Sequence, residues 1–204
     1  MTQLSIRLKW RLLAVPVLAL TALACASQGA PKFDQVDTPP DPSLAGYDKV
    51  YVADVTVADE LASRETAPFK STSGQEVRAV SATDLASKAR DVQEELVDQL
   101  GKSKQVVDAP GTDVLTVSAM LVDIASNRPT QADLESEASL SHRSLYTGRS
   151  EIRVDFSNQG RNLGSVTESY DGTFTDSVGN PAIWHDADQG IFYTADKVAR
   201  LLNE

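Results

Sequence analysis

Alternating hydrophobic and polar residues predict the strands of a β-sheet in this chain. Residues 47–57 and 113–126 carry hydrophobic side chains on both faces, as central strands covered by helices do. Between them, residues 104–107 predict a short strand that ends before a Pro110-Gly111 turn. The clearest alternation spans residues 150–174 and predicts an antiparallel hairpin with one hydrated face.

Hydrophobic residues at helical spacing predict two principal helices. Residues 81–101 begin with an N-cap pattern at Ser81 and Asp84, and Gly101 is placed to end this helix. Residues 188–204 predict the second helix, which closes the domain against the sheet. The hydrophobic stripes consist of Leu85, Ala89, Val92, Leu96 and Leu100 in the first helix and Ile191, Ala195, Val198 and Leu202 in the second.

The remaining segments of the folded part are polar. Residues 58–80 predict a surface insertion with a short helical piece near 58–64, and residues 126–148 predict a loop with some helix. The first helix also has a charged face with Lys88, Arg90, Glu94 and Asp98, which we interpret as solvated. The element order β-α-β-β-β-α predicts an α/β domain over residues 46–204. We expect a single mixed sheet of about four main strands with two principal helices packed against it.

Residues 1–24 have the three-part pattern of a secretory signal peptide. Basic residues occur only near the start, and a hydrophobic run follows over residues 12–24. A helix of that length reaches about 20 Å, whereas bilayer hydrocarbon is about 30 Å thick, so a membrane-spanning helix is not expected. Small residues at the end of the run place a cleavage site after Ala24.

Cys25, the single cysteine, follows this cleavage site directly in the stretch "TALAC". The stretch resembles the bacterial lipobox, which implies acyl chains such as palmitate on Cys25 and attachment to a membrane. Ordinary signal peptidase is the alternative, with cleavage after Ala24 or Ala26 and release of a soluble periplasmic protein. Because Ala26 and Ser27 lack the aspartate that is common in lipoproteins retained at the inner membrane, the same resemblance favours the periplasmic leaflet of the outer membrane. An anchor in the inner membrane is the alternative.

The region after Cys25 and the charge of the mature chain limit the partners. Residues 25–45 are rich in proline, aspartate, serine and glycine and predict a flexible tether. The leader holds three of the 19 basic residues and none of the 29 acidic residues, so 16 basic and 29 acidic residues remain, a net charge of −13. Such a surface repels nucleic acid, and we expect no nucleic-acid partner. One cysteine also excludes an internal disulfide.

Candidate chemistry is concentrated near the start of the last helix. The chain has two histidines, and His185 with Asp186 and Asp188 forms the best candidate site, either for a hydrolase base or for a hard metal ion. No G-x-S-x-G motif is present, and the histidine spacing typical of zinc sites is missing. We therefore favour a structural interpretation, in which Trp184 covers the domain edge and His185 helps to begin the helix. Neither a metal nor a cofactor is expected.

Three segments together resemble a known family. They are "GYDKVYVADVTV", "LVDQLGKSKQVVDAPGTDVLTVSAMLVDI" and "GRSEIRVDFSNQGRNLGSVTESYDG". They resemble Gram-negative lipoproteins catalogued as domain of unknown function 3313, from about Tyr47 to the C-terminus. The hairpin departs from the family pattern, because Asn158, Gln159 and Gly160 stand where an aspartate and glycine are frequent. The resemblance implies a lipoprotein with an α/β domain and no assigned reaction, and it supplies no catalytic residue.

These observations favour a non-enzymatic interaction domain that is held at a membrane by its N-terminal lipid. We expect an envelope protein as its partner and a role in envelope assembly or maintenance. The alternative is a periplasmic hydrolase or ligand-binding enzyme that uses His185 and nearby acids. A third interpretation is a lipoprotein that assembles with itself.

Overall fold

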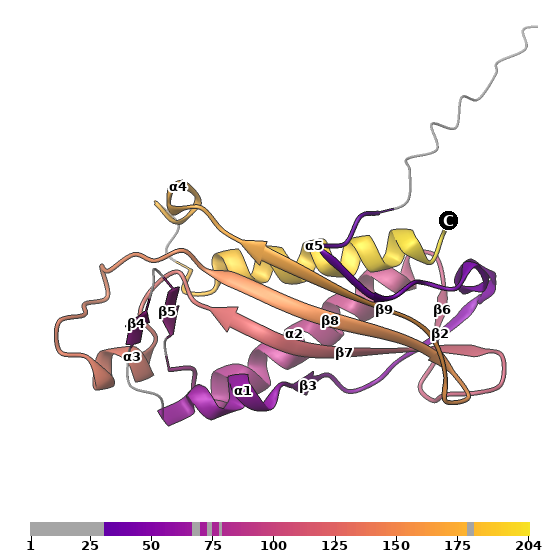
Figure 1. Cartoon of the computed structure of the whole chain (residues 1–204), viewed down its shortest axis with the longest axis horizontal. Helices are drawn as coiled ribbons and strands as arrows, with labels where there is room; N and C mark the ends of the chain where they lie inside the picture. Colours follow the sequence, from indigo (N-terminus) through magenta and orange to yellow (C-terminus); the bar gives the residue numbers. More distant parts are fainter. Residues whose placement is uncertain (1–30, 67–69, 73–74, 78, 179–181) are drawn as a thin grey trace, which may run out of the picture.

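The computed structural model describes residues 31–66, 70–72, 75–77, 79–178 and 182–204. Within them the chain forms an α/β sandwich, in which one mixed sheet is covered on one face by two long helices, α2 (Ala82–Gly101) and α5 (His185–Leu201) (Figure 1). Among these ranges, no helix combines the length and the hydrophobicity needed to cross a membrane.

The main sheet has the strand order β1-β9-β8-β7-β2-β6, and β3 pairs with β7 beside this path. Its longest strands are β7 (Val114–Ala125), β8 (Arg149–Asn158) and β9 (Arg161–Asp171), which pair antiparallel. The remaining strands are β1 (Gln35–Thr38), β2 (Lys49–Val52), β3 (Thr56–Val57) and β6 (Gln105–Val106). Strand β2 pairs parallel with β7 and β6, and α2 lies between β2 and β7 in the chain, as the predicted crossover requires.

The predicted number of about four main strands is wrong, because the main sheet has seven strands within the described ranges. Strand β1 had no sequence signal, since all four of its residues are exposed and none is needed for the core. It joins the sheet by backbone pairing with β9 and by two carboxylates: Asp34 accepts from the Ser169 amide at 3.0 Å, and Asp37 accepts from the Thr167 hydroxyl at 3.2 Å.

The predicted tether over residues 25–45 is also too long. Strand β1 lies within it, and it is followed by the 3₁₀ helix η1 (Pro42–Gly46), which buries Leu44 in the core. The Asp41 amide donates to the Leu163 carbonyl at 2.7 Å, and the Asp41 side chain caps η1 by accepting from the Ser43 amide at 2.9 Å. The ordered sheet therefore begins at Gln35, before the predicted domain boundary at residue 46.

The hydrophobic stripes of the two helices are confirmed as one side of the core. Ser81 caps α2 by accepting from the Asp84 amide at 3.1 Å. The helical core residues include Leu85, Val92, Leu96 and Leu100 of α2 and Ile191, Ala195, Val198 and Leu202 at α5, and they pack in one cluster with residues of β7, β8 and β9. On β8 the alternate residues face away from the helices and are partly exposed, as the predicted hydrated face requires. On β9 residues 163–168 are buried on both faces, so the prediction holds for β8 alone.

The hairpin between β8 and β9 turns at Gln159 and Gly160, whose φ angles are 49° and 77°. Positive φ at both central residues is the requirement of a type I′ turn, whose twist matches that of the flanking strands.

The two polar insertions gather at one end of the sandwich (Figure 1). The first contains α1 (Asp59–Ala62) and the 3₁₀ helix η2 (Ser63–Thr66), which confirms the predicted short helical piece. It also contains an unpredicted two-stranded sheet of β4 (Lys70–Thr72) and β5 (Gln75–Val77). The second contains α3 (Gln131–Ser136), and α4 (Phe174–Ser177) follows β9.

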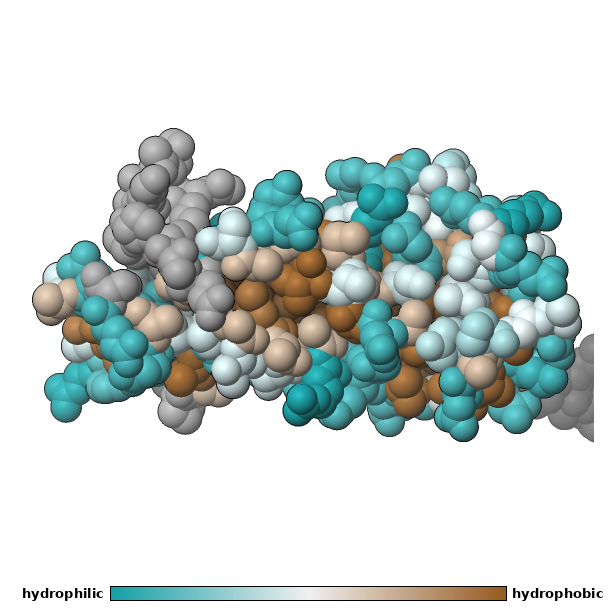
Figure 2. Space-filling view, turned by 90° about the horizontal axis from the view of Figure 1, so that it is seen from below, coloured by the Kyte–Doolittle hydropathy of each residue, from teal (hydrophilic) through white to brown (hydrophobic). Residues whose placement is uncertain are grey.

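Figure 2 shows the lower side of the molecule in Figure 1, where hydrophobic residues gather in the middle of the face, around α1 and β3. Val55, Val57 and Ala58 from this region are partly buried against the core. This hydrophobic surface is therefore the partly covered rim of the core beside β3.

Candidate functional site

The three candidate residues His185, Asp186 and Asp188 all lie in the first turn and a half of α5. Residues of an α-helix are rotated by about 100° from one to the next, so these side chains leave the helix in different directions. Asp186 is fully buried, Asp188 reaches α2, and His185 is half-buried. The helix therefore separates the three side chains.

Asp186 ties α5 to the loop after β7. Its carboxyl oxygen Oδ2 accepts from the Gly148 amide at 2.9 Å and from the Asn127 side-chain amide. In return, the Asp186 backbone amide donates to Asn127 Oδ1 at 2.9 Å. The position in the first turn of a helix also favours a carboxylate, because the unpaired amides there carry partial positive charge.

Two glycines make room for this carboxyl group. A Cβ built on Gly172 would overlap the Asp186 carboxyl group and lie 2.7 Å from its Cβ, and a Cβ on Gly148 would lie 2.7 Å from Asn127 Oδ1. The Gly172 amide also donates to the Gly148 carbonyl at 2.9 Å. We call Asn127, Gly148, Gly172 and Asp186 the buried junction. It joins the ends of β7, β8 and β9 to the start of α5.

The loop over residues 126–148 is held by further buried polar groups. Asn127 donates its backbone amide to the Ile183 carbonyl at 2.7 Å and accepts from the Tyr146 amide at 2.9 Å. Thr130 and Asp133 form a capping box at the start of α3, and both are buried. The predicted loop with some helix is confirmed, but its polar sequence gave no sign that these side chains are inside the protein.

Lys88 occupies the space between α2 and the start of α5. We predicted it on a solvated face, and this was wrong: Lys88 is buried, and its ammonium group donates to Asp188 at 2.6 Å and to Asp91 at 2.7 Å. The ammonium also lies 5.8 Å from the centre of the Trp184 ring, within the range of a cation–π contact. Burial alone would lower the pKa of Lys88, but the hydrogen bonds and charges of Asp188 and Asp91 together outweigh it, and the pKa is raised.

The Lys88→Gln variant is expected to lower the free energy of unfolding at pH 7 by about 1–3 kcal/mol, since it leaves two carboxylates without their shared cation. A raised pKa in the folded state means that Lys88 stabilises the fold below its ordinary pKa of 10.5. This contribution is lost as the pH rises through the raised value. Urea unfolding of the parent protein and of the Lys88→Gln variant, at pH 7 and above pH 10.5, measures the difference in their free energies of unfolding. This difference must be smaller at the higher pH.

The control for Lys88 is Arg90→Gln, because Arg90 is an exposed cation on the same helix. It should change the free energy of unfolding by less than about 0.5 kcal/mol. Equal effects of the two variants would contradict the structural role of Lys88.

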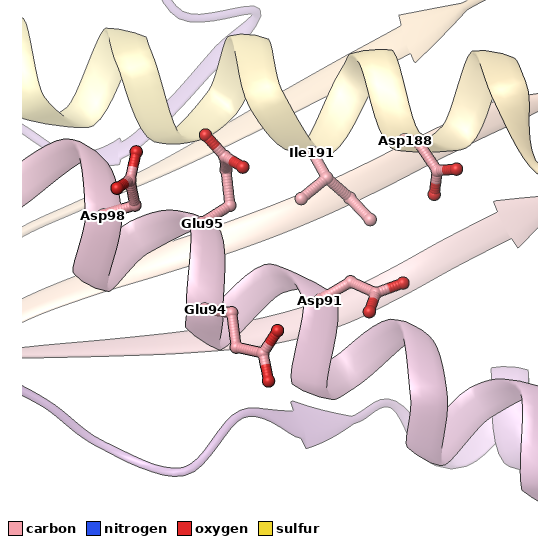
Figure 3. A pocket seen from close by; sticks show the side chains of 6 residues that line it. All are labelled: Asp91, Glu94, Glu95, Asp98, Asp188 and Ile191. Atoms are coloured by element: carbon pink, nitrogen blue, oxygen red, sulfur yellow. The ribbon is translucent and has the colours of Figure 1, made fainter.

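An open groove of about 430 Å³ lies between α2 and α5 (Figure 3). Its lining consists of Asp91, Glu94, Glu95, Asp98, Asp188 and Ile191. In Figure 3, Asp91 and Asp188 extend from facing helices. Lys88, which the figure does not draw, joins them by its two hydrogen bonds. The groove is acidic, and no histidine lines it. Over the ranges that the structure describes, no three His, Cys, Asp or Glu side chains are arranged to hold a metal ion.

His185 takes part in a chain of polar contacts on the other side of α5. Its Nε2 lies 3.0 Å from Gln189 Nε2, and Gln189 Oε1 accepts from the Tyr170 hydroxyl at 3.0 Å. His142, the second histidine, is exposed. The predicted cleavage site at Ala24 and the lipidation site at Cys25 lie outside the described residues.

A family model described as "Protein of unknown function (DUF3313)" matches residues 38–198. Among solved structures, the chain is similar to PelC from Paraburkholderia phytofirmans, with 11% identity, a TM-score of 0.47, and coverage of 83% of this chain and 99% of that chain. It is also similar to a Xanthomonas campestris protein of family model DUF330, with 13% identity, a TM-score of 0.42, and coverage of 84% and 91%. A DUF4136 family protein from Bacteroides thetaiotaomicron has 13% identity, a TM-score of 0.39, and coverage of 83% and 98%. No curated protein matches the chain.

Proposed function

This chain belongs to the DUF3313 family, and we propose that it is a non-enzymatic interaction domain anchored by lipid on Cys25 to the periplasmic leaflet of the outer membrane. The observation that carries this proposal is the distance along the chain between the lipobox-like stretch and the folded sheet. Only residues 26–34 separate Cys25 from β1. Nine extended residues reach about 30 Å at most, so lipid on Cys25 would hold the sheet close to the bilayer.

The sheet face opposite α2 and α5, which we call the open face, is the surface that we assign to a partner. It carries Asp123, Arg149, Glu151, Arg153 and Asp155, which alternate with the core residues of β7 and β8. Paired charges on a rigid sheet give a surface whose pattern a partner can match, and such complementarity favours specificity.

Ion pairs fix the charges of the open face in place. Asp123 binds Arg64 at 2.5 Å and Arg149 at 2.6 Å, and Arg153 binds Asp155 at 3.1 Å. Burial raises the pKa of the Glu151 carboxyl group, and the negative charge of Asp123 adds to this effect. The open face is therefore a mixed and ordered charge pattern, unlike the uniformly acidic groove on the helical side.

The proposal is tested with a photo-crosslinking amino acid in place of Asp155 in the natural chain, expressed in intact Gram-negative cells. We expect the chain to capture one discrete envelope protein. Mass spectrometry of the same purified chain should find Cys25 as the N-terminal residue, with acyl chains attached.

Two controls accompany this experiment. The same crosslinker in place of Arg90, which is exposed on α2, should not capture that protein. Cys25→Ser should abolish acylation and move the chain out of the membrane fraction. A mature chain that begins after residue 25, or an unmodified Cys25, would refute the anchor, and equal capture from both positions would refute the assigned surface.

A further inference from the structure

Four aromatic residues lie along the edge of the sandwich where the described chain begins. The rings of Tyr170 and Tyr193 lie 5.5 Å apart, and those of Phe192 and Tyr193 lie 5.7 Å apart. Phe33 lies 5.9 Å from the Lys197 ammonium, which is one helical turn from Tyr193 on the same side of α5. We call Phe33, Tyr170, Phe192 and Tyr193 the aromatic edge. Tyr170 belongs to β9, Phe192 and Tyr193 belong to α5, and Phe33 precedes β1, and Figure 1 shows these three elements side by side.

Much of the aromatic edge is open to solvent although the residues are large. Phe192 is 45% exposed and Tyr193 is 47% exposed, while the opposite side of α5 supplies the core. Val36 in the neighbouring strand β1 is 50% exposed. Exposed rings in contact, such as Phe192 and Tyr193, mark interaction surfaces, and aromatic rings favour the boundary between lipid headgroups and acyl chains.

The position at which the described chain begins indicates which partner surface faces the aromatic edge. Pro31 is six residues after Cys25, a distance of about 20 Å at most, and Phe33 is already packed beside α5. Acyl chains on Cys25 would therefore bring a bilayer to this edge. Val97 of α2 is also exposed, but it is far from the aromatic edge. It lines a groove with residues of β2 and β6, and β6 is at the opposite edge of the sheet from β1.

The charges at the aromatic edge permit contact with a membrane surface. Lys197 forms an ion pair with Glu168, so the central cation and anion of this edge neutralise each other. The whole mature chain is strongly acidic and would be repelled by anionic headgroups, so the contact would depend on the aromatic rings and the nearby lipid anchor.

We infer that the aromatic edge docks on the headgroup region of the bilayer that holds the lipid anchor, with Phe192 and Tyr193 at the lipid boundary. This inference rests on the proposed acylation of Cys25. It orients the domain, because the α5–β1 edge faces the membrane and the groove at Val97 faces the periplasm.

The test places a nitroxide label at Phe192→Cys or Val97→Cys in the natural lipidated chain, reconstituted in vesicles of phosphatidylethanolamine and phosphatidylcholine. Acylated Cys25 has no free thiol, so the introduced cysteine is the labelling site. We measure the accessibility of the label to oxygen, which concentrates in lipid, relative to a water-soluble nickel complex. This ratio should be at least about threefold higher at residue 192 than at residue 97, because interfacial side chains lie about 5–10 Å into the headgroup boundary.

Equal ratios at the two positions in an acylated chain would overturn the docking and leave the lipid anchor intact. If the parent chain itself accepts the label at Cys25, the anchor is refuted and the docking falls with it. Circular dichroism checks the fold of each variant, and Tyr193→Cys replaces Phe192→Cys if the latter does not fold.

Discussion

Replacing Gly172 with alanine is expected to lower the free energy of unfolding by about 3 kcal/mol or more, the sum of overpacking and of weakened hydrogen bonds to a carboxyl group. The new methyl group would occupy the space of the Asp186 carboxyl group. Asp186 would have to move, and its contacts with Asn127 and the Gly148 amide would be lost or lengthened. Thermal and urea unfolding of the purified chain, followed by circular dichroism, measures this loss.

Gly46→Ala is the matched control, because a Cβ at Gly46 meets no atom within 4 Å. It should leave the free energy of unfolding within about 0.5 kcal/mol of the parent value. If Gly172→Ala unfolds at the same urea concentration as Gly46→Ala, the prediction that a side chain at residue 172 does not fit beside Asp186 is wrong.

Asp186→Ala is expected to have an effect of similar size, about 3 kcal/mol, because it removes the acceptor of two buried donors. The Asn127 side chain and the Gly148 amide would remain in the interior without their carboxyl partner. We expect the loop over residues 126–148 to lose protection first, and hydrogen exchange of the Tyr146 amide, which donates to the Asn127 carbonyl, would report it.

Asp188→Ala separates this effect from a general effect of charge at the start of the helix. Both aspartates lie near the N-terminus of α5, and both changes introduce the same residue. The Asp188 side chain is half-exposed, and Lys88 keeps its second partner, Asp91, so the loss should stay near 1 kcal/mol or below. A larger loss of unfolding free energy for Asp188→Ala than for Asp186→Ala would contradict the stabilising role of the buried junction.

Together these variants distinguish two roles for the start of α5. A catalytic or ligand-binding role would require His185, Asp186 and Asp188 to act on one molecule. The structure instead places Asp186 in the interior, Asp188 beside Lys88 and His185 beside Gln189. The His185 contact lies within α5, whereas the contacts of Asp186 and Asp188 hold the helix against the sheet ends and against α2.

The helices and the hairpin could be predicted because their signals are local. A stripe such as Leu96 and Leu100 repeats at the helical period, and Ser81 caps the helix three residues before its partner. Such patterns depend on neighbours along the chain, and the burial of one helical face follows from them.

Strand β1 and Lys88 could not be predicted in the same way. Strand β1 is held by backbone pairing with residues 165–167, far away in the sequence, and its exposed residues have no hydrophobic period. Lys88 was placed on the polar face by its charge, but α5 supplies Asp188 and makes burial of the ammonium favourable. A charged residue can be buried where another element supplies the opposite charge.

Local sequence patterns were sufficient to predict the α/β class, the two hydrophobic helix faces and the family, because periodicity and motifs are properties of neighbouring residues. Only the tertiary structure decided that Asp186 is an interior link, that Gly172 must lack a side chain, and that Phe33 meets α5 beside exposed aromatic rings. Each of these depends on groups that are distant in the chain, and their distances are set only when the sheet and helices pack together.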